Sequence, residues 1–236
     1  MSVAENIEGI RQRIKAACER AGRDPAGVQL MGVSKTQPIE LIQEAVDAGL
    51  NLFGENKIQE AKIKIPQCPH SARFHFIGHI QTNKAKDAAR LFEMVHGVDS
   101  LRLAEELNKR ADNEARDLKY LVEVNVAGES SKFGYSPESL LNDIGALADL
   151  PRLELHGLMT IPPYTTDPKR SRPLFRRLVE LRDACEQKLG VPLGELSMGM
   201  SGDFEIAIEE GATIVRVGTA IFGPRKYRNP KADSDA

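Results

Sequence analysis

Apolar and polar positions alternate along the chain with two different periods. Near the amino terminus, apolar residues recur at spacings of three and four from Val3 through Ile14 to Ala21, which predicts an amphipathic helix that stops near Gly22. From Val28 onward, short apolar or β-branched runs alternate with stretches of helical period. That alternation is typical of βα units built around a parallel sheet.

Eight of the apolar runs have the length and composition of strands. The predicted strands cover residues 28–34, 50–54, 74–80, 94–98, 119–126, 153–161, 196–200 and 213–221. The predicted helices between them cover residues 39–48, 55–64, 83–92, 100–116, 137–148, 172–189 and 203–210. Pro137 behind Ser136 marks a capped helix start, and Pro66 marks a stop. The amino-terminal helix is left to cover the remaining strand.

These elements match an α/β fold of one domain. Eight parallel strands with interleaved helices in 236 residues predict a single-domain (β/α)8 barrel of the TIM type, whose usual size is about 250 residues. A doubly wound open sheet is the alternative. No linker or low-complexity tract interrupts the pattern, so we expect the barrel to occupy residues 1–225 and a polar tail to follow at residues 226–236.

Composition excludes several classes of partner. The hydrophobic fraction of 41% is ordinary for a globular protein, and a net charge of −2 gives no attraction to nucleic acid or to an anionic membrane. Cys18, Cys68 and Cys185 are odd in number and far apart, so we expect neither a disulfide framework nor a four-cysteine zinc site. The start lacks a secretory signal and no apolar run is long enough to span a bilayer, so we expect a cytoplasmic protein. No long apolar stripe is evident, and we expect a monomer.

The first predicted strand is followed directly by a lysine. Lys35 therefore lies at the carboxyl end of a strand, where α/β folds build their sites. Partial burial at such a rim lowers the pKa of a lysine and exposes the neutral amine that condenses with an aldehyde. Most lysines are solvated surface charges, so Lys35 by itself fits an aldolase, a cofactor carrier or an ordinary surface residue.

A second group of residues lies at the ends of the last two predicted strands. The segment 197–203 is rich in glycine and serine, and in barrels this position frequently binds phosphate through backbone N–H groups. A plain structural turn explains the glycines equally well. Arg216 interrupts an apolar strand and needs an acceptor, which is either a carboxylate such as that of Glu123 or an atom of a ligand, or both.

The histidines invite a metal interpretation, which strand geometry opposes. His75 and His79 are four residues apart, and on a strand that separation is about 13 Å, too far to share one ion. We therefore predict no metal site and expect these histidines to make hydrogen bonds at the strand end. Ser130 and Ser131 follow the fifth strand and are interpreted as a solvated turn.

Several segments together resemble the pyridoxal phosphate homeostasis proteins. They are the segments 33–36, 53–56, 75–84, 131–134, 157–160, 197–203 and 216–219. They occur in order over nearly the whole chain, and their combination is far more specific than any one of them. The resemblance implies the fold of the alanine racemase amino-terminal barrel and pyridoxal 5′-phosphate (PLP) as the cofactor.

The resemblance also implies roles for individual residues. Lys35 would form the Schiff base with PLP. The remaining contacts would come from Ser201 and the backbone of Met200, Gly218 and Thr219 to the phosphate, from Arg216 to the pyridine nitrogen, and from Asn56 beside the ring. A permanently protonated guanidinium discourages protonation of that nitrogen and so weakens the electron sink needed for carbanion chemistry. Position 37 is Gln where some relatives have a second lysine, which leaves Lys132 as the other lysine for cofactor transfer.

The expected function is PLP homeostasis without catalytic turnover, by buffering the cofactor or delivering it to apo-enzymes. Alanine racemases add a carboxyl-terminal domain that supplies a tyrosine base, whereas this sequence stops soon after the eighth predicted strand. Tyr164 is interpreted as a loop anchor. We therefore predict no catalytic residues. The alternatives are a racemase-like enzyme of low activity, a lysine-dependent aldolase, and a regulatory module that reports cofactor supply.

Overall fold

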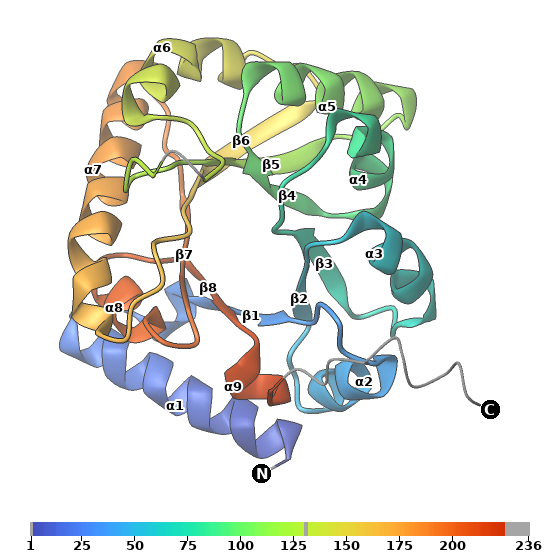
Figure 1. Ribbon diagram of the computed structural model, residues 1–236, viewed down its shortest axis with the longest axis vertical. Coiled ribbons are helices and arrows are strands. Elements are labelled where there is room, and N and C mark those ends of the chain that lie inside the picture. Colours follow the sequence, from blue (N-terminus) through green and yellow to red (C-terminus); the bar gives the residue numbers. More distant parts are fainter. Residues whose placement is uncertain (1, 130–131, 225–236) are drawn as a thin grey trace.

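Eight parallel strands close into a barrel in the computed structural model, which describes residues 2–129 and 132–224. The strands follow one another around the barrel in sequence order, and β8 pairs with β1 to close it (Figure 1). The predicted (β/α)8 barrel is confirmed and the open sheet is wrong. The strands are β1 (Gln29–Val33), β2 (Leu52–Glu55), β3 (Arg73–Phe76), β4 (Met94–Val98), β5 (Leu118–Glu123), β6 (Leu153–Met159), β7 (Glu195–Met200) and β8 (Ile214–Val217).

Helices surround the barrel on its outer side (Figure 1). They are α1 (Val3–Arg20), α2 (Ile39–Asp47), α3 (Ile58–Lys64), α4 (Ala85–Leu91), α5 (Leu101–Asn113), α6 (Pro137–Ala148), α7 (Arg172–Leu189), α8 (Phe204–Glu209) and α9 (Thr219–Phe222). The predicted ranges 137–148 and 172–189 coincide with α6 and α7. Ser136 caps α6 by accepting a hydrogen bond from the Ser139 backbone N–H, as its position before Pro137 predicts.

The core has an outer and an inner part. The main hydrophobic cluster joins the outer faces of the strands to the helices and includes Phe53 and Val95. The residues preceding these two in sequence, Leu52 and Met94, belong to two smaller clusters. Because successive side chains of a strand point to opposite faces, these smaller clusters fill the interior of the barrel. Burial on both faces explains why the strands are continuous apolar runs in the sequence.

Helix α1 covers the side of the barrel where the sheet closes. Its buried face includes Ile7, Ile10 and Ile14, and the helix packs against α2, α8 and α9. A capping box between Ser2 and Glu5 fixes its start. The amino-terminal helix therefore has the covering role that the sequence predicts for it.

Several predicted elements have different ends in the structure, among them three that differ by three residues or more at one end near the site. The predicted strand 213–221 stops at Val217, and its last residues form α9. The predicted strand 74–80 stops at Phe76, and the predicted helix 55–64 begins only at Ile58. Buried apolar residues that continue past the strands explain the two strand errors, because Ile77 (9% exposed) and Ile221 (0% exposed) lie in the core without belonging to a strand. The predicted helix begins late because β2 extends through Glu55.

The predicted tail at residues 226–236 and the serines at 130 and 131 lie outside the described residues. Among the helices that the structure does describe, none has both the length and the apolar character needed to cross a membrane.

Candidate ligand-binding site

A cavity of about 530 Å3 opens at the carboxyl ends of the strands. This volume lies within the range of small-molecule sites, roughly 300 to 1,000 Å3. Its walls come from the ends of β1, β2, β7 and β8 and from the loop that joins β6 to α7. All the residues that the sequence assigns to the cofactor line it, namely Lys35, Asn56, Met200, Ser201, Arg216, Gly218 and Thr219. Their individual contacts with a cofactor remain predictions.

Lys35 lies in a tight turn directly after β1. The Gln37 backbone N–H donates to the Ser34 carbonyl over 3.0 Å and closes the turn. Thr36 adopts a left-handed conformation with a φ of 63°, which is unusual for a residue with a branched side chain. Lys35 itself is half-buried and lines the cavity. The strand-end position that the sequence predicts for this amine is therefore confirmed.

The ends of β7 and β8 meet on the other side of the cavity. The Gly218 backbone N–H donates to Ser201 Oγ over 3.3 Å, which joins the two loops. The Met200 N–H donates to Asp203 Oδ1 over 2.7 Å, so this group, assigned to phosphate from the sequence, already has an acceptor. Gly199 has a φ of 91°, and a Cβ there would lie 2.5 Å from the Cβ of Ala207. Packing against α8 therefore requires this glycine.

Arg216 is buried, with 3% of its surface exposed, and has two acceptors in the barrel. Nη1 donates to Ser197 Oγ over 2.6 Å, and Nη2 donates to the Thr160 carbonyl over 2.8 Å. Burial lowers the pKa of Arg216 to about 10, so the guanidinium stays protonated at neutral pH.

Glu123 is the carboxylate that the sequence suggests as a partner for Arg216. The ion pairs of the described residues do not include this pair, so direct pairing of the two side chains is wrong. The hydroxyl and carbonyl acceptors on β7 and after β6 occupy that role instead. Glu123 nevertheless influences the site by its charge. Burial and, to a smaller extent, the charge of Asp99 raise the pKa of Glu123 to about 7, against the opposing charges of Arg216 and His79.

A chain of buried hydrogen bonds continues from Arg216 across the barrel. Ser197 Oγ lies 2.9 Å from His96 Nδ1, and His96 Nε2 lies 3.0 Å from His75 Nδ1. An arginine can only donate, so Ser197 Oγ accepts from Arg216 and its own proton is available for His96 Nδ1. This order places the proton of each neutral histidine on Nε2. His75 Nε2 is buried and has no hydrogen-bond partner among the described residues.

Both histidines of this chain are held in the neutral form. Burial, with smaller contributions from the charges of Arg73 and Lys119, lowers the pKa of His75 to about 3. Burial also brings the pKa of His96 well below its ordinary value, with smaller effects from His75 and Arg216. His96 is not among the residues predicted for the site, and Ser197 enters the prediction only as the first residue of the segment 197–203. The available signal was a polar residue within an apolar strand, the same signal that identified Arg216.

His79 lies apart from this chain of hydrogen bonds, at the rim of the barrel. Its Nδ1 is 2.9 Å from Asp99 Oδ2, and its ring stacks on Phe133 with centroids 3.7 Å apart. The expected hydrogen bonding of His75 and His79 near the strand end is therefore found, with different partners for each. Within the described part of the chain, no group of three or more His, Cys, Asp or Glu side chains is arranged to hold a metal ion.

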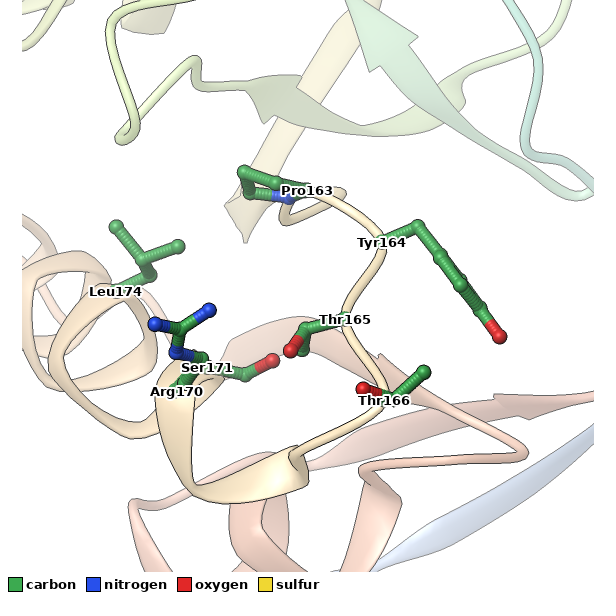
Figure 2. A pocket seen from close by; sticks show the side chains of 7 residues that line it. All are labelled: Pro163, Tyr164, Thr165, Thr166, Arg170, Ser171 and Leu174. Atoms are coloured by element: carbon green, nitrogen blue, oxygen red, sulfur yellow. The ribbon is translucent and has the colours of Figure 1, made fainter.

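The loop after β6 forms the outer wall of the cavity. Tyr164 on this loop is 92% exposed, so its interpretation as a loop anchor is wrong. Figure 2 shows its ring directed away from Arg170 and Leu174, which line a neighbouring cavity with it. Lys132 crosses toward the same loop and donates to the Ile161 carbonyl over 3.4 Å, while it pairs with Glu129.

Comparison with known proteins identifies the family. Residues 6–226 match the family model of the alanine racemase N-terminal domain. The pyridoxal phosphate homeostasis protein of Aquifex aeolicus is 46% identical over 230 residues, which are 96% of this chain and 100% of that protein. The pyridoxal phosphate homeostasis protein of Pseudomonas aeruginosa is 45% identical, over 97% of this chain and 98% of its own length.

Solved structures agree with this result. A protein of unknown function from Bifidobacterium adolescentis is 37% identical with a TM-score of 0.87, and the match covers 93% of this chain and 94% of that one. PipY of Synechococcus elongatus with PLP bound is 34% identical with a TM-score of 0.82, over 94% and 100% of the two chains. An alanine racemase of Clostridium difficile, 15% identical with a TM-score of 0.74, matches 97% of this chain and 58% of its own and shares the fold. The chain belongs to the alanine racemase N-terminal domain family and, within it, to the pyridoxal phosphate homeostasis proteins.

Proposed function

We propose that this chain binds PLP as a Schiff base through Lys35 and takes part in PLP homeostasis in the cytoplasm, by buffering the cofactor and delivering it to apo-enzymes. The observation that carries the proposal is the convergence of Lys35, Ser201 and Arg216 on one cavity. The PLP-bound state of PipY, a relative of similar length, supports the same ligand class.

The cavity has the chemical groups that PLP requires. Ser201 and the backbone of Gly218 and Thr219 line the cavity and would hold the anionic end of such a ligand, and the Arg216 guanidinium would donate to the acceptor nitrogen of its ring. Asn56 Oδ1 is buried and lacks a hydrogen-bond partner among the described residues, which leaves an acceptor for a ligand hydroxyl. When bound, the cofactor supplies an aldehyde attached to an electron-withdrawing ring.

Lys35 performs the covalent step. Its neutral amine attacks the aldehyde carbon, a carbon–nitrogen double bond forms, and the carbonyl oxygen leaves as water. Hydrolysis reverses the reaction and restores both the amine and the aldehyde, which is the property that buffering requires. Arg216 keeps a donor toward the ring nitrogen throughout, because its guanidinium remains charged at neutral pH.

The arrangement of the tyrosines within residues 2–129 and 132–224 supports binding without turnover. Racemisation needs a second base on the face of the ring opposite the lysine. The hydroxyl groups of Tyr120 and Tyr135 donate to the Leu147 carbonyl and to Asp143. Tyr164 lines the cavity with its ring 92% exposed to solvent, and it is the residue through which a slow racemase-like activity would act.

Borohydride reduction tests the covalent assignment. The protein is incubated with PLP, reduced, digested and mapped by mass spectrometry. The adduct is expected on Lys35 and is lost in Lys35→Ala. Lys132→Ala, which removes another lysine near the mouth, is expected to keep a stoichiometric adduct. A stoichiometric adduct that persists elsewhere in Lys35→Ala contradicts the proposal.

A transfer assay tests the homeostasis role. Holo-protein is mixed with an apo-enzyme that depends on PLP, in the presence of a trap for free cofactor. Activation that survives the trap supports direct delivery, whereas activation that the trap abolishes leaves buffering by release into solution. Interconversion of amino-acid enantiomers by the holo-protein at rates typical of enzymes, about 1 s⁻¹ or faster, contradicts a non-catalytic role.

A further inference from the structure

A buried ion cluster lies behind the Lys35 turn. Lys64, the last residue of α3, is 6% exposed, and its Nζ donates to Glu55 Oε1 over 2.9 Å and to Glu60 Oε1 over 2.6 Å. Glu55, at the end of β2, is fully buried. Burial raises the pKa of Glu55, and the charge of Lys64 opposes that increase. None of these three side chains belongs to the lining of the cavity.

The cluster holds the residues on both sides of Lys35. Lys64 Nζ donates to the Ser34 carbonyl over 2.9 Å, and the Ser34 hydroxyl donates to Glu55 Oε1 over 2.7 Å. On the other side, the Thr36 backbone N–H donates to Glu60 Oε1 over 2.6 Å. The same cluster therefore fixes the backbone immediately before and immediately after Lys35.

The conformation of the turn requires such a restraint. Thr36 has a φ of 63°, and a left-handed conformation is unfavourable for a non-glycine residue. Such conformations persist where the surroundings determine them, which here means the hydrogen bond to Glu60. A buried ion cluster gives little net stability, because desolvation offsets the attraction between the charges. Its position around one turn is better explained by the geometry that it imposes.

Another lysine on the same helix shows the usual arrangement. Lys62 pairs with Asp87 over 3.0 Å, and its side chain is 39% exposed. Lys64, by contrast, lies on the buried face of α3 with Ile58 and Ala61. All three of its hydrogen bonds point to the cluster and to the turn that carries Lys35.

We infer that Lys64, with Glu55 and Glu60, forms a group of positioning residues that fixes the Lys35 turn in the geometry for attack on the aldehyde. The inference rests on the proposed function of Lys35. The cluster acts through Ser34 and Thr36 and does not touch the ligand. Loss of the cluster lets the turn relax, so that the amine spends less time in the reactive position, and even a small misplacement of a reacting group reduces rates strongly.

Three variants test this inference: Lys64→Met, Glu60→Ala, and Lys62→Met as the matched control on the same helix. Hydrogen exchange of the apo-protein measures the Thr36 amide, and absorbance measures the rate of Schiff-base formation with PLP and the dissociation constant. Lys64→Met and Glu60→Ala are expected to exchange the Thr36 amide faster and to form the Schiff base about tenfold more slowly or worse. Lys64→Arg is expected to recover part of the rate, and Lys62→Met to behave as the unmodified protein.

The outcomes separate this inference from the proposed function. Absence of a Schiff base in the unmodified protein overturns the proposed function, and the role of the cluster is then judged by the Thr36 amide alone. A Schiff base that forms equally fast in the unmodified protein, Lys64→Met and Glu60→Ala overturns the positioning role. Glu60, whose side chain is 24% exposed, provides the milder variant if Lys64→Met does not fold.

Discussion

His75 and His96 share a hydrogen bond of 3.0 Å inside the barrel, although they come from different strands and each is almost fully buried. Through Ser197 this pair is connected to Arg216. The orientation of the guanidinium in the cavity therefore depends on two uncharged histidines deeper in the barrel.

The histidine pair predicts a loss of stability in acid. The pKa of His75 is about 3 in the folded protein, below the ordinary value of 6.5, so the unfolded chain binds more protons between these two values. The free energy of unfolding is therefore highest above pH 6.5 and falls as the pH decreases toward 3. The expected contribution of His75 to the slope is about 1.4 kcal/mol per pH unit, measured by urea unfolding at several pH values.

Matched histidine variants isolate this contribution. His75→Leu is expected to flatten the slope in that window by about the same amount, because it removes the titrating group. His156→Gln removes a histidine at the surface that pairs with Glu154, and its slope is expected to follow the unmodified protein. Identical slopes for His75→Leu and the unmodified protein would show that His75 is not held neutral.

Ser197→Ala removes the hydroxyl that joins the guanidinium to the histidines. The change takes away the hydrogen-bond partner of Arg216 Nη1 and of His96 Nδ1, and both groups are buried. We expect a loss of about 1 to 3 kcal/mol in the free energy of unfolding, measured by urea denaturation. Ser139→Ala, at an exposed position of α6, is expected to change it by less than about 0.5 kcal/mol. Equal stabilities for the two variants would contradict the role of Ser197 in the hydrogen bonds that connect Arg216 to His96.

Glu123→Gln is expected to have an effect of the opposite sign. The pKa of Glu123 is raised from 4.5 to about 7 in the folded protein, so the folded state retains a proton that the unfolded chain has released. This carboxyl group therefore reduces the free energy of unfolding as the pH rises through that window. At pH 8 the variant should be more stable by about 1 to 3 kcal/mol, and at pH 4 the two proteins should be alike.

Glu154→Gln is the control for that comparison, because the Glu154 side chain is 50% exposed. Its difference from the unmodified protein is expected to be small at both pH values. A Glu123→Gln variant that is no more stable than the unmodified protein at pH 8 would mean that Glu123 ionises normally in the folded state.

Two glycine substitutions are expected to act in opposite directions. A Cβ at Gly157 would lie 1.8 Å from the Glu195 carbonyl oxygen, where β6 meets β7, so Gly157→Ala forces the two backbones apart. We expect the loss of a cooperative thermal transition or a large decrease in its midpoint. Gly145 lies within α6 with open space where a Cβ would stand, and Gly145→Ala is expected to stabilise the protein by about 0.5 to 1 kcal/mol. Similar midpoints for both variants would contradict the close approach of these strands.

The sequence predicts the barrel because each strand is buried on both faces and each helix on one. Lys35 and Arg216 were found by local rules, namely a lysine at a strand end and a charge within an apolar strand. His96 is likewise a polar residue within an apolar strand, β4, and the same rule would have identified it. The local pattern does not predict which of these residues contact one another, because such contacts depend on the register of strands far apart in the sequence.

The remaining parts of the site depend on contacts that no local pattern reveals. His96 and Ser197 are separated by 101 residues, and Lys64 reaches a carbonyl 30 residues earlier. In the sequence Lys64 is only the last residue of an amphipathic helix. Residues 219–221 of α9 belong to the predicted strand 213–221 because the apolar run continues to Ile221. Only the end of the strand pairing at Val217 distinguishes the strand from the helix.

The hydrogen bond from Asn6 Nδ2 to the Ile221 carbonyl, 2.8 Å long, joins the first helix to the last and can form only when both have been synthesised. During synthesis α1 leaves the ribosome first, and α9 leaves it after all eight strands. The two helices pack against each other in the folded protein. Gly218 and Thr219, which form one wall of the cavity, reach their places only after the whole sheet has been synthesised. The complete cavity therefore exists only after β8 and α9 have left the ribosome.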